Sequence, residues 1–171
     1  AGTGTNCARG ITLAGAFHPP VLVLAATAVL YPLSPRQFRA GDAEVAKYGV
    51  LGDAAFFAWL EASHQDIFSG GPAREHAIAT SCRAKAAIVA RDERETGDRM
   101  LLNLGHTFGH AFEAAAGFSD KLLHGEAVGL GMSLAFEFSA CRGLIGQDEA
   151  DRAIAHLAAG WLPTHVKPDG G

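Results

Sequence analysis

The run Leu-Asn-Leu-Gly-His-Thr-Phe-Gly-His at residues 102–110 constrains the fold of this chain more than any other segment. It lies in an apolar pattern with helical spacing, and residues four apart share one face of a helix, so His106 and His110 point into the same space. Gly105 and Gly109 precede them. Glycine inside a helix costs about 1 kcal/mol relative to alanine, which usually needs a packing reason. The run therefore predicts a helix that a second helix or a ligand approaches closely.

Composition and charge place the chain among folded proteins. Apolar residues make up 49% of its 171 residues, enough for a hydrophobic core, and the formal net charge is −4. Acidic and basic residues are interspersed, so we expect no nucleic-acid partner. The apolar stretch at residues 21–30 is too short to span a bilayer, so no membrane partner is expected either.

The cysteines and the N-terminus indicate a cytoplasmic protein. Cys7, Cys82 and Cys141 are odd in number and far apart, which argues against a disulfide framework or a cysteine–zinc site and fits a reducing compartment. No charged segment followed by a signal-peptide core opens the chain. It begins with Ala1 instead of Met, in a Gly/Thr-rich stretch, as expected of a chain cut from a longer protein, although processing would leave the same start.

Hydrophobic periodicity predicts a mainly α fold. Residues 1–20 are expected to form loops, and 21–24 a short buried strand, before prolines break the chain again. From Gly41 the character changes to helix. Five helices are expected, joined in part by a charged connection at 92–98: residues 43–63, interrupted at Gly49 or Gly52, then 74–89, 100–115, 124–141 and 148–159. A helical domain preceded by a short α/β remnant is the predicted fold class.

The histidines allow two interpretations when each is taken alone. An isolated H-x-x-x-H pair is more often structural than metal-binding, and Thr107 stands where a zinc protease would carry its catalytic glutamate. His124 and Glu126 open another apolar helical pattern. There, His124 is either an exposed residue at a helix start or a metal ligand delivered from a second helix.

The charged and polar residues also allow a purely structural interpretation when each is taken alone. Glu44 and Lys47 are three apart and could form a solvated ion pair. Lys85 and Arg99 could belong to a surface charge cluster around residues 92–95. Asn103 could be an ordinary polar position on a helix.

Together, however, these segments resemble the 3-dehydroquinate synthase family of the sugar-phosphate cyclase superfamily. The matching segments follow the order and spacing of the family from about residue 15 to residue 145: residues 15–18, 36–37, 41–49, 85, 92–95, 99–110 and 123–132. The Asn-Leu-Gly-His-Thr-Phe-Gly-His run, followed by Leu-His-Gly-Glu-Ala-Val, is the most specific part of the resemblance.

The resemblance implies a two-part architecture. In the family an α/β domain binds NAD, and a C-terminal helical domain supplies the metal and most substrate contacts. Residues 1–40 match the tail end of the NAD-binding domain, and residues 41–171 match the helical domain without its final segment. A dinucleotide-binding G-x-G-x-x-G unit is absent from the sequence, and Gly2 and Ile11 stand where the family has lysines. We therefore expect this chain alone not to catalyse the family's reaction, although its metal site is expected to be able to form.

The resemblance also implies roles for individual residues. Glu44, His106 and His124 match the ligands of one Zn²⁺ or Co²⁺ ion. Five further residues match positions around the substrate, with Lys85 and Arg99 suited to its carboxylate and Asn103 and His110 toward its phosphate: Lys47, Lys85, Arg99, Asn103 and His110. Glu95 matches a polar residue near the same pocket. Four residues match a stretch beside the nicotinamide of NAD, although Pro32 replaces the usual threonine: Val29, Leu30, Tyr31 and Pro32.

The implied activity is that of a carbon–oxygen (phosphate) lyase in the shikimate pathway of aromatic amino acid biosynthesis. The substrate would be 3-deoxy-arabino-heptulosonate 7-phosphate, and the products 3-dehydroquinate and phosphate. NAD would act catalytically, and the full-length protein would be a homodimer. Two alternatives remain open: another sugar-phosphate cyclase acting on a different heptulose or hexose phosphate, and a non-catalytic helical remnant that binds metal.

Overall fold

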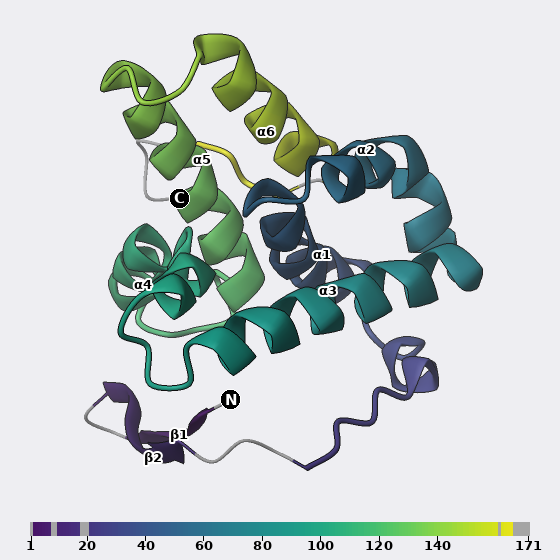
Figure 1. Ribbon diagram of the computed structural model, residues 1–171, viewed down its shortest axis with the longest axis vertical. Helices are drawn as coiled ribbons and strands as arrows, with labels where there is room; N and C mark the ends of the chain where they lie inside the picture. The colour runs from purple at the N-terminus through teal and green to yellow at the C-terminus, as the bar shows by residue number, and fades with distance from the viewer. Residues whose placement is uncertain (1, 8–9, 18–20, 161, 166–171) are drawn as a thin grey trace.

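The computed structural model describes residues 2–7, 10–17, 21–160 and 162–165, and side chains from residue 21 onward. Within these residues the chain is mainly helical, as predicted (Figure 1). The helices are α1 (Pro35–Val50), α2 (Ala54–Ser69), α3 (Pro72–Arg91), α4 (His106–Ala115), α5 (His124–Cys141) and α6 (Gln147–Ala159), with two 3₁₀ helices, η1 (Thr27–Leu30) and η2 (Asp98–Asn103). None of the described helices has the length and apolar character needed to cross a membrane.

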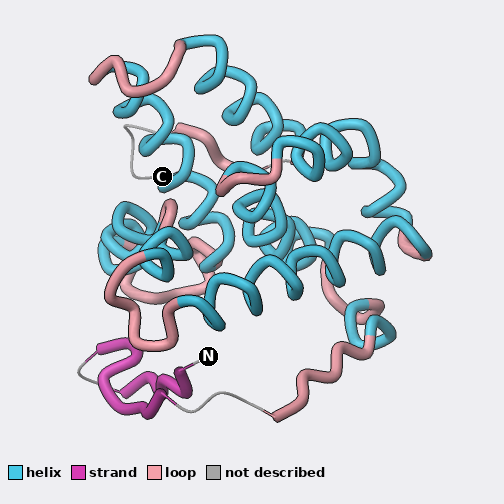
Figure 2. The backbone as a smooth tube through the Cα atoms, viewed as in Figure 1, coloured by secondary structure: helices cyan, strands magenta, loops and turns pink. Residues whose placement is uncertain are grey.

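The N-terminal predictions were wrong in two places. Residues 1–20 were expected to be loop, but Figure 2 shows two strands there, β1 (Gly2–Cys7) and β2 (Gly10–Phe17). They pair antiparallel, with Gly2 opposite Phe17. Residues 21–24 were expected to form a buried strand, but they are exposed and have no regular structure. A strand needs a partner for its backbone groups, and apolar composition alone does not supply one.

Local signals explain where α1 begins and ends. Ser34 accepts a hydrogen bond from the Gln37 N–H, the Gln37 side chain caps the Ser34 N–H in return, and Pro35 occupies the first turn. The helix therefore starts before Gly41, where helical character was expected to begin. It stops before Gly52, whose φ is 139°, and Asp53 caps α2. The predicted interruption near Gly52 is confirmed.

The predicted helix over residues 100–115 is instead two elements. The 3₁₀ helix η2 ends at Asn103, Gly105 adopts φ = 79°, and α4 starts at His106. A Cβ at Gly105 would lie 2.6 Å from the Val128 carbonyl oxygen, so both the left-handed backbone and the neighbouring helix require glycine. His106 is consequently the first residue of α4, one turn before His110.

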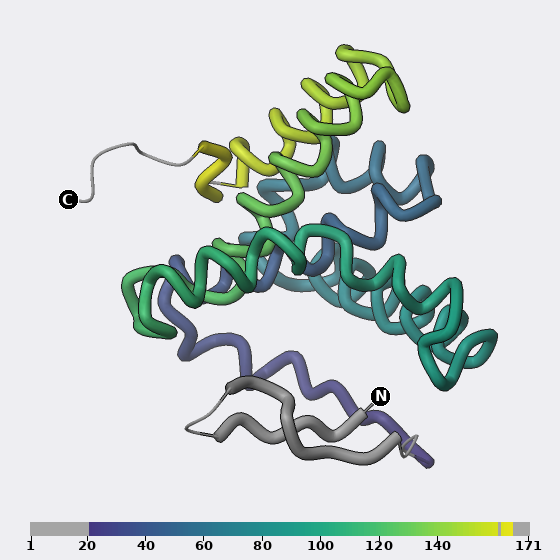
Figure 3. The backbone as a smooth tube through the Cα atoms, turned by 90° about the vertical axis from the view of Figure 1, so that its left-hand side faces the viewer, coloured from purple at the N-terminus to yellow at the C-terminus, as the bar shows by residue number. Residues whose placement is uncertain are grey.

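Helix α5 is the centre of the packing, in contact with α1, α4 and α6; Figure 3 shows α6 alongside it. It approaches its neighbours at backbone distance. A Cβ at Gly131 would lie 2.0 Å from the Gly105 carbonyl oxygen of the segment that leads into α4, and a Cβ at Gly125 would lie 1.7 Å from the Ala40 carbonyl oxygen of α1. The expectation that glycines before His106 and His110 admit a second helix is confirmed.

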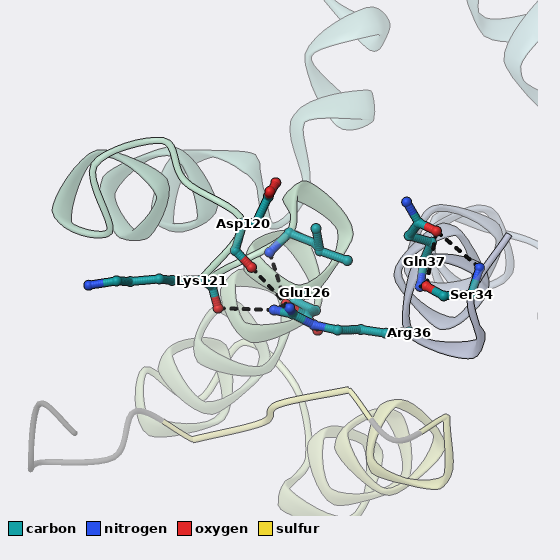
Figure 4. Close-up of polar contacts among 7 residues, drawn as sticks. Ser34, Arg36, Gln37, Asp120, Lys121 and Glu126 are labelled. Atoms are coloured by element: carbon teal, nitrogen blue, oxygen red, sulfur yellow. Dashed lines mark hydrogen bonds and ion pairs between the residues drawn. The ribbon is translucent and has the colours of Figure 1, made fainter.

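An arginine ties the start of α5 to the start of α1 (Figure 4). Arg36 donates from Nε and Nη2 to the two carboxylate oxygens of Glu126, each at 2.6 Å. Its remaining bonds go to the carbonyl oxygens of Asp120, at 2.9 Å, and Lys121, at 3.0 Å. Glu126 also accepts the Leu123 N–H at 2.9 Å, which caps α5. This network fixes the turn that delivers His124.

The close glycine contacts generate a first prediction. Gly125→Ala and Gly131→Ala should each lower the free energy of unfolding by about 1–3 kcal/mol or more, because the added methyl must displace backbone. Gly41→Ala is the matched control: this helical position has nothing within 4 Å of an added Cβ, and the change should raise stability by about 0.5–1 kcal/mol. Urea unfolding followed by circular dichroism measures all three. Equal effects at the three positions would contradict the packing described.

Asp42 generates a second prediction, of pH-dependent stability. Burial raises the pKa of this α1 carboxyl to about 6, an effect that the nearby His64 partly opposes. Because the pKa is higher in the folded chain than its ordinary value of 3.8, the folded state holds the proton more tightly. The contribution of Asp42 is therefore fully present below about pH 4 and lost as the pH rises through about 6, a change of about 3 kcal/mol.

Asp42→Asn should remove this dependence. The free energy of unfolding of the variant, relative to the original chain, should rise between pH 4 and pH 7 by about the same amount. The exposed Asp66 provides a control, since Asp66→Asn should leave the pH profile of urea unfolding unchanged. A parallel profile for Asp42→Asn and the original chain would show that this carboxyl does not govern the pH dependence.

Candidate metal centre

One cavity of about 430 Å³ gathers most of the residues that the sequence singled out. Seven of the eight predicted metal and substrate residues line it: Glu44, Lys47, Lys85, Arg99, Asn103, His106 and His124. They come from five elements. Helix α1 supplies the glutamate and the first lysine, α3 the second lysine, η2 the arginine and the asparagine, and α4 and α5 one histidine each from their first residue.

Three electron-pair donors converge at one end of this cavity. The Glu44 Oε1 atom lies 3.3 Å from His106 Nε2 and 3.8 Å from His124 Nε2, and the donor atoms of the three residues all lie within 4.8 Å of one another. Donors around a tetrahedral ion at 2.0–2.1 Å are about 3.4 Å apart. Glu44 Oε1 is buried and has no hydrogen-bond partner among the described residues. A divalent cation would satisfy that atom, so the three residues fit a metal.

The charge state of Glu44 also suits a metal ligand. Burial by itself would raise the pKa of this carboxyl, but the neighbouring His106 imidazole and Lys47 ammonium outweigh it and lower the pKa to about 2. Lys47 is almost fully buried and donates at 2.7 Å to Glu44 Oε2 and at 2.9 Å to the Leu102 carbonyl oxygen. The carboxylate is therefore charged at neutral pH, with Oε2 held by the lysine and Oε1 directed at the histidines.

The hydrogen bonds of His106 determine which ring nitrogen faces the centre. Its Nδ1 lies 3.2 Å from the Leu104 carbonyl oxygen, which can only accept, so Nδ1 carries the proton. With a cation bound, the lone pair of Nε2 would face that ion beside Glu44 Oε1. Because residues 104–106 form the glycine turn before α4, the same turn that admits α5 also sets the tautomer of this histidine.

A short loop arranges the polar side of the cavity. The Asp92 carboxylate accepts hydrogen bonds from the backbone N–H groups of Thr96, Gly97 and Arg99. These bonds, led by the one from Thr96, lower the pKa of Asp92 to about 2. The loop holds Glu95 at a positive φ of 61°, from which it accepts a bond from Asn103 Nδ2 at 2.7 Å and lies 4.0 Å from Arg99 Nε. The loop therefore positions the predicted carboxylate-binding arginine.

Two groups of predicted residues lie outside this lining. His110 is exposed on α4, with its ring centroid 5.5 Å from that of His106, so it borders the centre without lining the cavity. Val29, Leu30, Tyr31 and Pro32 lie in and after η1. There, Leu30 lines a separate apolar pocket and the Tyr31 ring lies 5.9 Å from the Arg74 guanidinium. The metal cavity and this predicted cofactor segment are separate places in the described chain.

Tyr48 lines the cavity but did not stand out in the sequence. Its ring is buried, and burial, together with the nearby Glu44 charge, raises its pKa to about 12. Its place four residues after Glu44 on α1 is the signal that could have found it, because residues four apart share a helix face.

Comparison with known proteins connects this geometry to a family. The family model of the 3-dehydroquinate synthase C-terminal domain matches residues 41–170. The chain is 69% identical over 169 residues to 3-dehydroquinate synthase of Rhodopseudomonas palustris and 64% identical to that of Nitrobacter winogradskyi. These alignments cover 99% of this chain and 44% of each relative, so the chain spans less than half their length.

Two solved structures share the fold. ValA, the 2-epi-5-epi-valiolone synthase of Streptomyces hygroscopicus subsp. jinggangensis 5008, with NAD⁺ and Zn²⁺ bound, superposes with a TM-score of 0.87 at 29% identity over 98% of this chain and 47% of ValA. A 2-deoxy-scyllo-inosose synthase complexed with carbaglucose-6-phosphate, NAD⁺ and Co²⁺ gives 0.78 at 23% identity, over 99% and 46%. Because the family model matches residues 41–170, most of the chain, the chain belongs to the 3-dehydroquinate synthase C-terminal domain family.

Proposed function

We propose that this chain is the metal- and substrate-binding part of a 3-dehydroquinate synthase, which converts 3-deoxy-arabino-heptulosonate 7-phosphate to 3-dehydroquinate and phosphate. The observation that carries the proposal is the convergence of Glu44, His106 and His124 beside a cationic cavity wall, in a chain 69% identical to a named 3-dehydroquinate synthase. In this proposal residues 1–40 are the end of the NAD-binding domain, and residues 41–171 belong to the helical domain.

The metal would be one Zn²⁺ or Co²⁺ ion held by Glu44, His106 and His124. Two imidazoles and one carboxylate leave coordination positions open for substrate hydroxyls, and a metal there would supply Lewis-acid polarisation of the alcohol that is oxidised. Lys47 holds Glu44 in place through its bond to Oε2 and keeps that carboxylate ionised. The protein's own contribution is thus a charged, pre-oriented ligand set.

The remaining residues would hold the substrate. Lys85 and Arg99 supply positive charge for its carboxylate, and the planar guanidinium of Arg99 can bind a carboxylate through two parallel hydrogen bonds. Asn103 lies one turn further along η2, and His110 lies beyond His106, in positions suited to the phosphate. Glu95 restrains both Arg99 and Asn103, so the anion-binding groups are ordered before substrate arrives.

NAD would bind mainly to the part of the protein that precedes residue 41, with backbone contacts from Val29, Leu30, Tyr31 and Pro32. Bound NAD supplies reversible oxidation of a ring alcohol, which acidifies the neighbouring C–H before phosphate is eliminated. We further propose that the whole protein is a cytoplasmic homodimer of the shikimate pathway. Conversion of the substrate requires the NAD-binding domain, so we expect this chain alone to bind ligands without releasing phosphate.

A second candidate function is cyclisation of a different sugar phosphate. The resemblance to ValA, at a TM-score of 0.87, supports it, and the replaced lysines at positions 2 and 11 are compatible with an altered substrate. The identity of 29% to ValA against 69% to 3-dehydroquinate synthase favours the latter. The presence of Lys85 and Arg99, both suited to a carboxylate, favours it as well.

The metal assignment predicts the behaviour of a ligand variant. His124→Ala should abolish stoichiometric zinc binding, because only two protein donors would remain at the centre. His165→Ala is the matched control, since His165 is an exposed histidine whose ring pairs loosely with Glu137 at 3.8 Å. Isothermal titration with Zn²⁺ and metal analysis after dialysis measure both. Unchanged zinc content in His124→Ala would refute the ligand set.

The substrate assignment predicts selective loss at Arg99. Arg99→Lys keeps the positive charge but loses the two-bond geometry, and it should weaken binding of 3-deoxy-arabino-heptulosonate 7-phosphate to the zinc-loaded chain about tenfold or more. Arg91→Lys, in an exposed ion pair with Asp98, should leave the dissociation constant unchanged. Titration calorimetry compares them. Equal affinity of both variants and the original chain would argue against Arg99 as a substrate residue.

A further inference from the structure

The ring of His124 has a carboxylate on each side. Its Nε2 faces Glu44 Oε1 at 3.8 Å, toward the metal centre, and its Nδ1 lies 3.1 Å from Glu113 Oε1. Glu113 lies on α4, two turns after His106, while His124 is the first residue of α5. The two helices that supply the histidines are therefore linked by this polar contact, in addition to the close backbone approach at Gly105 and Gly131. The polar contact lies on the side of the His124 ring that faces away from Glu44.

Glu113 is well shielded from solvent for a glutamate. Its side chain is 13% exposed, and its Oε2 atom is buried without a hydrogen-bond partner among the described residues. A buried carboxylate with one unpaired oxygen is costly, so its place against His124 needs a compensating reason.

We propose that Glu113 is the positioning residue of His124: its carboxylate accepts a hydrogen bond from the Nδ1–H group, and this contact presents the Nε2 lone pair to the metal. This inference rests on the proposed metal-binding function and extends it to a residue outside the cavity lining. A carboxylate can only accept, so the proton sits on Nδ1 and Nε2 remains free. The anionic partner also makes the imidazole a stronger electron-pair donor.

His124 needs such a partner more than His106 does. The His106 side chain is 16% exposed and is held by the Leu104 carbonyl oxygen within its own turn. The His124 side chain is 51% exposed, and residues near it in sequence do not fix its ring. A carboxylate from α4 restricts the rotation of that ring, as outer partners commonly do for histidine ligands of metals.

A different arrangement of the same atoms gives the competing outcome. His110, Glu113 and His124 also place donor atoms within 4.8 Å of one another and could hold a cation of their own. That cation would need the Nδ1 lone pair of His124, which the proposed tautomer does not offer. One bound ion per chain is therefore expected, and two ions would overturn the positioning role.

Glu113→Ala and Glu113→Gln, compared by zinc titration and by the visible absorption spectrum of bound Co²⁺, test the proposal. Glu113→Ala should weaken zinc binding about 10–100-fold and alter the Co²⁺ spectrum. Glu113→Gln should recover part of the affinity, because its amide oxygen can still accept the Nδ1 proton but carries no charge. The matched control is Glu137→Gln, which makes the same chemical change at a glutamate of α5 that lies 3.8 Å from the exposed His165. Its zinc affinity and Co²⁺ spectrum should match those of the original chain.

The outcomes separate this inference from the metal assignment on which it rests. If the original chain binds one zinc, His124→Ala does not, and both Glu113 variants match the original affinity and spectrum, the positioning role is wrong and the ligand set stands. If the original chain binds no zinc, both are wrong. A purely structural role would lower the unfolding temperature of the metal-free variants without changing the zinc affinity or the Co²⁺ spectrum of the folded chains, and would also overturn the proposal.

Discussion

The backbone-to-backbone approach of α5 to α1 and to the start of α4 is the constraint on which the rest of the structure depends. At Gly125 and Gly131 the neighbouring carbonyl oxygens occupy the space that a methyl group would need. The first contact brings the beginning of α5 against α1, one residue after His124. The second brings α5 against the turn that starts α4, one residue before His106. The contact at Gly125 thus joins α5, whose first residue is His124, to α1, which carries Glu44. The contact at Gly131 joins α4, whose first residue is His106, to α5.

Electrostatics then determine what this convergence can bind. Lys47 neutralises one oxygen of Glu44 and leaves the other facing two imidazole nitrogens, so the centre is rich in electron pairs while its local charge is balanced. Burying Lys47 and partly burying Glu44 costs desolvation energy, which their contact and the bond from Lys47 to the Leu102 carbonyl oxygen only offset. Such an arrangement suits ligand binding better than it suits stability, as is common where perturbed pKa values cluster.

Sequence reasoning predicted the helical body well and its ends poorly. Periodicity located the cores of α3 and α6 because their buried positions repeat at helical spacing. Helix α5 was located by its long apolar stretch instead, since residues 127–133 are buried on every side. Periodicity missed the break between η2 and α4, because glycine at 105 reads as a weak helix residue until the packing of α5 shows that its backbone must be left-handed. Sequence reasoning also failed to predict the pairing of β1 with β2, because strand pairing depends on two segments together and not on either one alone.

The candidate site shows the same division between local and distant information. His106 and His110 were recognisable as a pair from their spacing, but their separate positions follow from the turn at Gly105, which places the first at the centre and leaves the second exposed. Glu44 entered only through a family resemblance, because 62 residues separate it from His106 and no local pattern connects them. Glu113 carried no signal of its own, and the only signal for Tyr48 was its place four residues after Glu44 on one helix face. Each gained a place only when another helix packed against it.

Three supports of the candidate metal centre lie within the helical body, among the residues that the structure describes. Arg36 fixes the turn before His124, the Leu104 carbonyl oxygen orients His106, and Lys47 bridges Glu44 to η2. Each of these three supports joins residues between positions 36 and 126, so the helices and the turns between them set the geometry of the candidate ligands. A ligand set held in this way is pre-organised, so in the proposed function substrate binding would not need to assemble it. In the proposed function, the helical part would therefore keep its metal site fixed, while the partner domain and the loops around the cavity would decide which sugar phosphate is used.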